Sequence, residues 1–256
     1  MTTNNSILRI RYSKLGKVRY TSHRDTARIW ERTLRKVGMP VAYSEGFSPR
    51  PKLGFGLALP TGYESAGEYL DITVAAPDEL DGALVGVGLA DGRRFDIESL
   101  SQLLSQALPD GIDVQAVEVL ENRGESLQEQ IVMCGWEFEI SDLEPEDARA
   151  AVTRVLESVS LQTTREHKGA ERTEDIRPSI HRLEVIGPSD WGTWLQADLS
   201  AKPRVVRPSE LVPVLAPGCE LTRAKRTHQW KEQAGSHLEP LAPVAPLAPH
   251  AMVRAS

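Results

Sequence analysis

The feature that most constrains the fold is one order of hydrophobic patterns that occurs twice along the chain. Alternating apolar and polar residues are typical of half-buried strands, and apolar residues spaced by three or four are typical of helices. In each half these patterns follow one another as strand, helix, strand, strand, helix, strand. This is the order of a ferredoxin-like unit. We therefore expect an α+β protein with two ferredoxin-like βαββαβ units in tandem, although the halves share no residue-level repeat.

The same patterns give the expected boundaries. The first unit is expected over residues 7–110 and the second over 111–232. In the first unit, strands are expected at 7–11, 41–43, 53–59 and 68–74, and helices from Ser22 or Asp25 to Gly38 and over 78–89. In the second unit, the expected elements are strands at 114–120, 130–140, 177–186, 191–199 and 221–230, a helix at 145–159 capped by Asp142, and a helix at 208–215.

The last part of the chain has a different composition. Residues 233–256 are rich in proline and alanine, and the prolines recur regularly without a packing pattern. Such a composition is typical of an extended segment. We predict a disordered tail outside the fold, with a docking peptide as the alternative interpretation.

The residue types present limit the chemistry that we expect. The 256 residues include only two cysteines, too few for the three-cysteine motif of a radical SAM iron–sulfur cluster. The six histidines show no metal-ligand spacing, and neither phosphate-cradling glycine motif is present. We therefore expect no cofactor. With no signal peptide at the first residues and no stretch long and apolar enough to cross a bilayer, we expect a cytoplasmic protein that does not enter membranes.

Positive charge is concentrated near the beginning of the chain. Residues 9–52 contain twelve Lys and Arg against three acidic residues, a local balance of +9 in a chain with a net charge of −6. Arg24, Arg28, Arg32 and Arg35 lie on the predicted first helix, opposite its apolar stripe, and we call these four residues the basic ridge. Clustered cations favour a polyanion such as RNA, because binding releases phosphate counterions. The alternative is a solvated helix face with carboxylates from elsewhere packed against it.

The loop at 44–52 suggests how a single strand could be held. Gly46 permits an unusual turn, Phe47 offers a stacking face, and Arg50 and Lys52 add cations. Base stacking combined with phosphate contacts is a common way to bind single-stranded RNA. The alternative places Phe47 in the core and leaves the prolines only to shape a connection.

Other residues near the basic ridge complete the predicted site. His23 is suited to acid–base chemistry near a phosphate, since its usual pKa is close to neutrality, or else serves as a structural residue at the helix start. Glu45 is suited to orient a ligand hydroxyl or a basic partner, or else forms an ordinary ion pair. The predicted nucleic-acid or partner-binding residues are Arg19, Tyr20, His23, Arg24, Arg28, Arg32, Arg35, Tyr43, Glu45, Phe47, Arg50 and Lys52.

Three segments resemble one known family. They are RYTSHRD at 19–25, the segment 31–53 that ends in EGFSPRPKL, and LALPTGYESAGEYLD at 57–71. They closely resemble the bacterial radical SAM-linked family, which is built on a domain of unknown function, and a weaker collinear similarity continues to the strand around Arg223. The resemblance implies a protein encoded beside, or fused to, a B12-binding radical SAM enzyme. It implies an accessory component and supplies no catalytic residues.

Three functional hypotheses follow. The first is a non-catalytic accessory protein that binds or presents RNA to a B12-binding radical SAM partner. The second is a metal-independent endoribonuclease in which His23 is the acid or base, an idea that rests on analogy between folds. The third is a module whose basic surface docks on an acidic surface of the partner protein and does not contact RNA.

Overall fold

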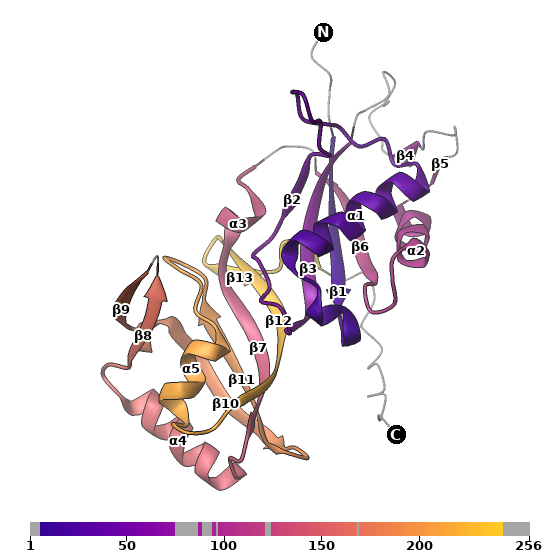
Figure 1. Ribbon diagram of the computed structural model, residues 1–256. Helices are drawn as coiled ribbons and strands as arrows, with labels where there is room; N and C mark the ends of the chain where they lie inside the picture. Colours follow the sequence, from indigo (N-terminus) through magenta and orange to yellow (C-terminus); the bar gives the residue numbers. More distant parts are fainter. Residues whose placement is uncertain are drawn as a thin grey trace.

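The computed structural model describes residues 6–74, 87–88, 94–95, 97–120, 124–167 and 169–242. The predicted α+β class is confirmed, because helices cover a large mixed sheet (Figure 1). The strands of this sheet follow the order β10-β11-β7-β12-β3-β1-β6, with β2 paired to β3 and β13 paired to β12. Both halves of the chain thus contribute to one continuous sheet.

The N-terminal half forms one end of the sheet. Strand β1 (Ser6–Lys14) lies between β3 (Glu64–Val74) and β6 (Val114–Leu120), antiparallel to both, and the short β2 (Leu53–Phe55) pairs with β3. A 3-10 helix, η1 (Gly16–Tyr20), leads from β1 to α1 (His23–Val37), and α2 (Ile97–Ala107) precedes β6. Leu8, Ile10 and Tyr12 of β1 pack with Trp30 of α1 and Leu104 of α2 in one hydrophobic core.

The C-terminal half forms the other end and has its own core. Strand β7 (Ile131–Ser141) lies between β11 (Gly192–Ser200) and β12 (Leu221–Gln233), and β10 (Ile180–Pro188) pairs with β11 at the edge. Helices α4 (Pro145–Glu157) and α5 (Pro208–Leu215) pack on one face of these strands. Their core contains Trp136, Phe138, Val155, Leu195 and Leu211, all fully or almost fully buried.

The strand order is the same in both halves. When the separate two-stranded sheets within 87–95 and 162–175 are left aside, the second, third, first and fourth strands of each half lie side by side, as β2-β3-β1-β6 and as β10-β11-β7-β12. The tandem ferredoxin-like units, which were inferred from the order of elements along the sequence, stay a prediction. The halves are joined because β12 also pairs in parallel with β3, at Lys225 with Glu64 and at Arg226 with Ser65.

Several predicted boundaries differ from the structure. The proposed division between residues 110 and 111 placed the strand at 114–120 in the second unit, but β6 pairs with β1 and therefore completes the N-terminal half. Asp142 does not cap α4; the N-cap is Glu144, followed by Pro145, and the helix ends at Glu157. The helix expected at 78–89 lies mostly outside the described residues, and Val87–Gly88 form β4, paired with β5 (Arg94–Phe95).

Some elements were not predicted. A separate hairpin of β8 (Gln162–His167) and β9 (Ala170–Asp175) precedes the 3-10 helix η2 (Arg177–Ser179), so β10 starts three residues later than expected. A four-residue helix, α3 (Leu127–Gln130), leads into β7, and its N-cap Ser126 forms a capping box with Glu129. No helix within the described part of the chain is both long and apolar enough to cross a bilayer.

The predicted tail begins too early. Strand β12 continues to Gln233, and β13 (Ser236–Leu238) folds back to pair with it. The next residues pack on the N-terminal half: the Glu239 carboxylate lies 3.0 Å from the Arg11 guanidinium, and the Tyr69 hydroxyl donates to the Leu241 carbonyl oxygen at 3.4 Å. Residues 233–242 therefore belong to the fold, and the rest of the predicted tail, 243–256, lies outside the described residues.

Candidate nucleic-acid interface

The basic ridge lies on α1, whose ends follow the predicted signals. The Ser22 side chain caps the helix by accepting from the Asp25 amide at 3.1 Å, and Gly38 ends it in the left-handed conformation with a φ of 76°. Trp30 and Leu34 are buried against the sheet. Because the apolar stripe faces inward, all four ridge arginines are exposed, as predicted.

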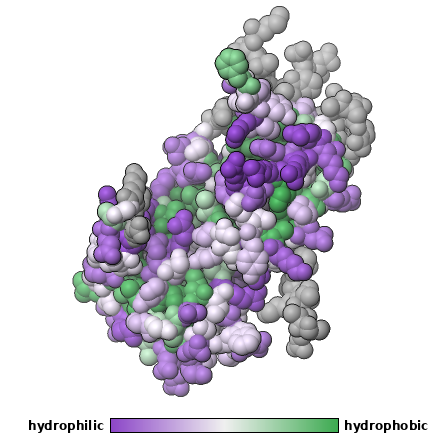
Figure 2. All heavy atoms as spheres, viewed as in Figure 1, coloured by the Kyte–Doolittle hydropathy of each residue, from purple (hydrophilic) through white to green (hydrophobic). Residues whose placement is uncertain are grey.

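Few carboxylates neutralise the ridge. Arg28 pairs with Asp25 at 3.2 Å, and about half of each side chain is exposed. Within the described residues, Arg24, Arg32 and Arg35 make no ion pair. The alternative of a ridge covered by carboxylates therefore has no support from the described residues. Figure 2 shows strongly hydrophilic residues gathered over α1.

The ridge also has a regular spacing. Successive ridge arginines are three or four positions apart, and four residues rise about 6 Å along a helix. A single strand of nucleic acid likewise carries its charges at regular intervals along its backbone. The ridge is therefore suited to contact several phosphates in succession.

The loop at 44–52 is held by its own backbone and carries an exposed aromatic side chain. The Ser44 amide donates to the Arg50 carbonyl oxygen at 2.8 Å, and the Arg50 amide donates to the Ser44 hydroxyl at 3.0 Å. Phe47 is fully exposed, so the interpretation that places it in the core is wrong. Tyr43, Glu45, Arg50 and Lys52 are exposed as well.

Among the described residues, neither Glu45 nor His23 has the purely structural contact that was considered for it, an ion pair for Glu45 and the helix cap for His23. Glu45 forms no ion pair with a described residue, so the expected ordinary ion pair is not observed there. His23 does not cap α1, since Ser22 does. Its exposed ring lies edge-on to Phe55, with the ring centroids 5.1 Å apart.

His23 and Phe55 belong to a groove that the sequence did not reveal. This groove, which we call the β2 groove, has a volume of about 630 Å³. It lies between β2, the start of α1 and the turn that leads into α3. Arg9 and Asp71 also line it; the Arg9 guanidinium donates to both carboxylate oxygens of Asp71, each at 2.8 Å.

Arg19 and Tyr20 belong to a second, smaller cavity. The Arg19 guanidinium donates to the Tyr20 hydroxyl at 2.8 Å and lies 3.6 Å from Glu64, to which Arg223 of β12 is also paired at 3.7 Å. This cavity of about 200 Å³ lies between the two halves. The predicted residues thus fall into four groups, namely the ridge on α1, the loop at 44–52, the β2 groove and this cavity.

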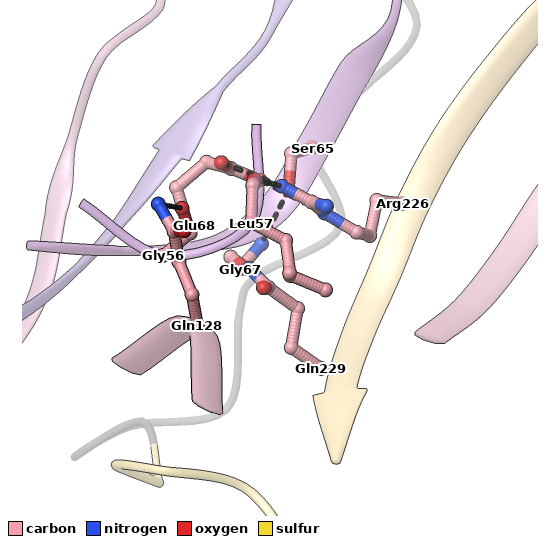
Figure 3. A network of polar contacts seen from close by, with 8 residues as sticks. All are labelled: Gly56, Leu57, Ser65, Gly67, Glu68, Gln128, Arg226 and Gln229. Atoms are coloured by element: carbon pink, nitrogen blue, oxygen red, sulfur yellow. Dashed lines mark hydrogen bonds and ion pairs between the residues drawn. The ribbon is translucent and has the colours of Figure 1, made fainter. Parts of the chain in front are cut away.

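A buried ion pair connects the halves beside these surfaces (Figure 3). Arg226 of β12 is completely buried and donates to both carboxylate oxygens of Glu68, at 2.6 and 2.7 Å, and to the Leu57 carbonyl oxygen at 2.7 Å. Three residues further along β12, the Gln229 amide donates to the Gly67 carbonyl oxygen at 2.8 Å. The network therefore fixes β3 relative to β12.

Burial around this network changes the acidity of nearby groups. Desolvation raises the pKa of the Cys134 thiol to about 11, and it lowers the pKa of Lys14. Cys134 therefore stays protonated at neutral pH and behaves as a small apolar side chain. These groups serve the fold and take no part in the exposed basic surface.

The fold and the site define a class of α+β protein with one continuous sheet and a basic helix on its surface, of whose four ridge arginines only Arg28 pairs with a described carboxylate. Residues 8–208 match a family described as an uncharacterized protein conserved in bacteria, DUF2344. Since the match covers most of the chain, the protein belongs to this family. No curated protein matches the sequence.

The cap of α1 gives a first testable prediction. Replacing Ser22 with alanine removes the acceptor for the Asp25 amide, and we expect a loss of about 1 kcal/mol in the free energy of unfolding. Chemical denaturation measures this change. Ser22→Thr retains a hydroxyl that accepts from the Asp25 amide and donates to the Asp25 carboxylate, and it should keep most of the stability; equal losses in both variants would contradict the assigned cap.

Proposed function

We propose that this protein binds single-stranded RNA along the basic ridge and presents it to a B12-binding radical SAM enzyme. The observation that carries the RNA proposal is the ridge itself, with four exposed arginines of which only Arg28 pairs with a described carboxylate. The exposed Phe47 and Arg50 of the loop at 44–52 supply a stacking face and a further cation. The partner enzyme in the proposal rests on the resemblance to the radical SAM-linked family.

Salt dependence provides the test of RNA binding. We expect the variant with all four ridge arginines changed to glutamine to bind a single-stranded oligonucleotide more weakly. The slope of log K against log salt concentration should be less steep by about 3, since each phosphate contact on a single strand contributes about 0.7. Fluorescence anisotropy across a salt series measures both quantities.

A matched control separates the ridge from net charge. Arg149, Arg172, Arg182 and Lys202 are exposed cations of the C-terminal half, and changing all four to glutamine removes the same charge. This control variant should keep the wild-type slope. Equal effects in the two variants, or no RNA binding by the wild-type protein, would refute the ridge as the RNA-binding surface.

A pull-down from native lysate, with and without RNase, tests the partner. Recovery of a radical SAM enzyme together with RNA crosslinked to peptides from residues 19–52 would support the full proposal. Recovery of the enzyme alone, unaffected by RNase, would favour the docking hypothesis, in which the basic surface contacts the partner protein.

The nuclease hypothesis is kept as a second candidate because His23 and Lys52 line the same groove. A histidine near a phosphate-binding cation is a suitable acid or base for RNA cleavage. His23→Ala should then abolish cleavage and leave binding along the ridge intact. Absence of cleavage by the wild-type protein would exclude this candidate.

A further inference from the structure

We propose that the β2 groove binds the base and ribose of one unpaired nucleotide of the RNA that crosses the basic ridge. The inference rests on the proposed function and adds a subsite to it. The groove and the ridge adjoin, because His23 lines the groove and the next residue, Arg24, is the first arginine of the ridge. A strand that contacts the ridge can therefore place one of its nucleotides in the groove.

The size of the groove fits such a ligand. Its volume of about 630 Å³ lies within the range of small-molecule sites, about 300–1,000 Å³. The groove is partly open to solvent, so a nucleotide can enter without separating packed elements. Gly54 lies in the lining, and a Cβ atom built there would meet only Asp71 atoms, at 3.7 and 3.9 Å.

The wall of the groove offers an aromatic surface. Phe55 is half-buried, and the edge-on contact with His23 holds the two rings at an angle of 71°. Unpaired bases stack on such rings, and aromatic–base stacking contributes about 1–3 kcal/mol per base. A ring that is partly buried already needs little further ordering to accept a base.

Polar groups line another part of the groove, on the other face of β2, because Gly54 pairs with Asp71 whereas Phe55 pairs with Leu70. Asp71 accepts from Arg9, which is nearly buried and also donates to the Gln130 side chain at 3.2 Å. Gln128 reaches from α3 toward Gly56 (Figure 3), but its amide nitrogen lies 3.5 Å from the carbonyl oxygens of both Gly56 and Phe55. These long bonds are weak, so the amide is available to a ligand. An amide and a carboxylate together provide the donors and acceptors that a base edge needs.

The charged residues that line the groove indicate which part of a nucleotide it binds. Within the lining, Arg9 and Lys52 are balanced by Asp71 and Glu125. A neutral groove favours a base and ribose over a chain of phosphates, whereas the ridge beside it carries unneutralised cations. The base is therefore assigned to the groove and the phosphates to Lys52 at its rim and to the ridge.

The test fills the groove without changing any charge. Gly54→Leu places a side chain over Asp71, in the space assigned to the base. We expect a roughly 2- to 10-fold loss of affinity for a single-stranded oligonucleotide, from lost hydrogen bonds beside Asp71, with an unchanged salt slope. Binding of an RNA duplex of the same length should not change, because its bases are not available to the groove. Gly187→Leu, at a glycine of β10 with open space around its Cβ position, is the matched control and should bind as the wild-type protein does.

The outcomes separate this inference from the proposed function. If the ridge variant loses RNA binding and Gly54→Leu keeps it, the groove is not a nucleotide site and the ridge proposal stands. If the wild-type protein binds no RNA, titration with nucleoside monophosphates tests whether the groove binds a free nucleotide instead of a nucleotide of RNA. Binding that Gly54→Leu abolishes would support a free nucleotide in the groove, and absence of binding would overturn the inference.

A second variant covers the case in which Gly54→Leu does not fold. Gln128 is exposed on α3, and Gln128→Ala should fold normally while weakening single-stranded binding without changing the salt slope. An oligonucleotide with a photoreactive base should crosslink to peptides that contain His23 or Phe55. Crosslinks confined to the 44–50 loop and unchanged binding by Gln128→Ala would overturn the groove assignment.

Discussion

Replacing Arg226 with methionine is expected to lower the free energy of unfolding by about 3–5 kcal/mol. The substitution leaves the Glu68 carboxylate buried without its guanidinium, and it leaves the Leu57 carbonyl oxygen without the donor that lies 2.7 Å away. Because Arg226 is completely buried, water does not replace the lost bonds without opening the junction of β3 and β12. Equilibrium unfolding in urea measures the change.

A double-mutant cycle identifies the cause. Glu68→Leu alone should be comparably destabilising, since it leaves the Arg226 charge without a partner. The double variant should recover a large part of the stability, because replacing both members of a buried pair by apolar residues is often nearly neutral. Arg182→Met breaks an exposed pair with Glu184 and should cost less than about 1 kcal/mol. If the losses from the two single substitutions simply add in the double variant, the two side chains are not coupled.

The second large effect is expected at Glu239, in the segment that composition assigned to a disordered tail. Glu239→Met should cost about 3 kcal/mol in the free energy of unfolding, because it leaves the Arg11 charge buried without a carboxylate. Only 3% of the Arg11 side chain and 10% of the Glu239 side chain are exposed, so solvent screens the pair weakly. One nitrogen of the Arg11 guanidinium already lacks a hydrogen-bond partner, which makes the site less tolerant of a further loss.

Denaturation in urea, compared with a nearby control, tests this prediction. Glu232→Met changes an exposed glutamate of β12 and should alter the stability by less than about 0.5 kcal/mol. Similar stabilities for Glu239→Met and the wild-type protein would show that residues 239–242 do not hold Arg11 in solution.

The sequence predicted the elements whose signals are local. The cap at Ser22, the apolar stripe through Trp30 and Leu34, and the stop at Gly38 are all contained in α1, so the helix and its exposed arginines followed from spacing alone. The helix over 208–215 was predicted with its observed ends for the same reason. The loop at 44–52 followed from its glycine and prolines, although composition did not decide whether Phe47 faced the core or the solvent.

The features that depend on distant contacts could not be predicted. Arg226 and Glu68 are 158 positions apart, and a strand rich in cations gives no sign that one of them is buried. The strand at 114–120 was predicted, but its pairing with β1 depends on tertiary structure. The β8–β9 hairpin has mostly polar residues, so its sequence shows no clear alternation of apolar and polar residues. The prolines that follow β13 led to the prediction of a disordered tail, and the buried ion pair of Glu239 was therefore not predicted. The β2 groove combines six segments that are separated in the sequence, and none of them indicates a groove by itself.

The position of β12 has a consequence for how the protein is made. During translation, β3 leaves the ribosome long before β12, yet at Glu64 and Ser65 the edge of β3 that faces away from β1 pairs only with that late strand. Until β12 arrives, this edge of the N-terminal half has no partner, and open strand edges are templates for pairing with other chains. Closing a contact across so many residues is also slow. We therefore expect the nascent N-terminal half to be the stage most prone to aggregation and the one most dependent on chaperones.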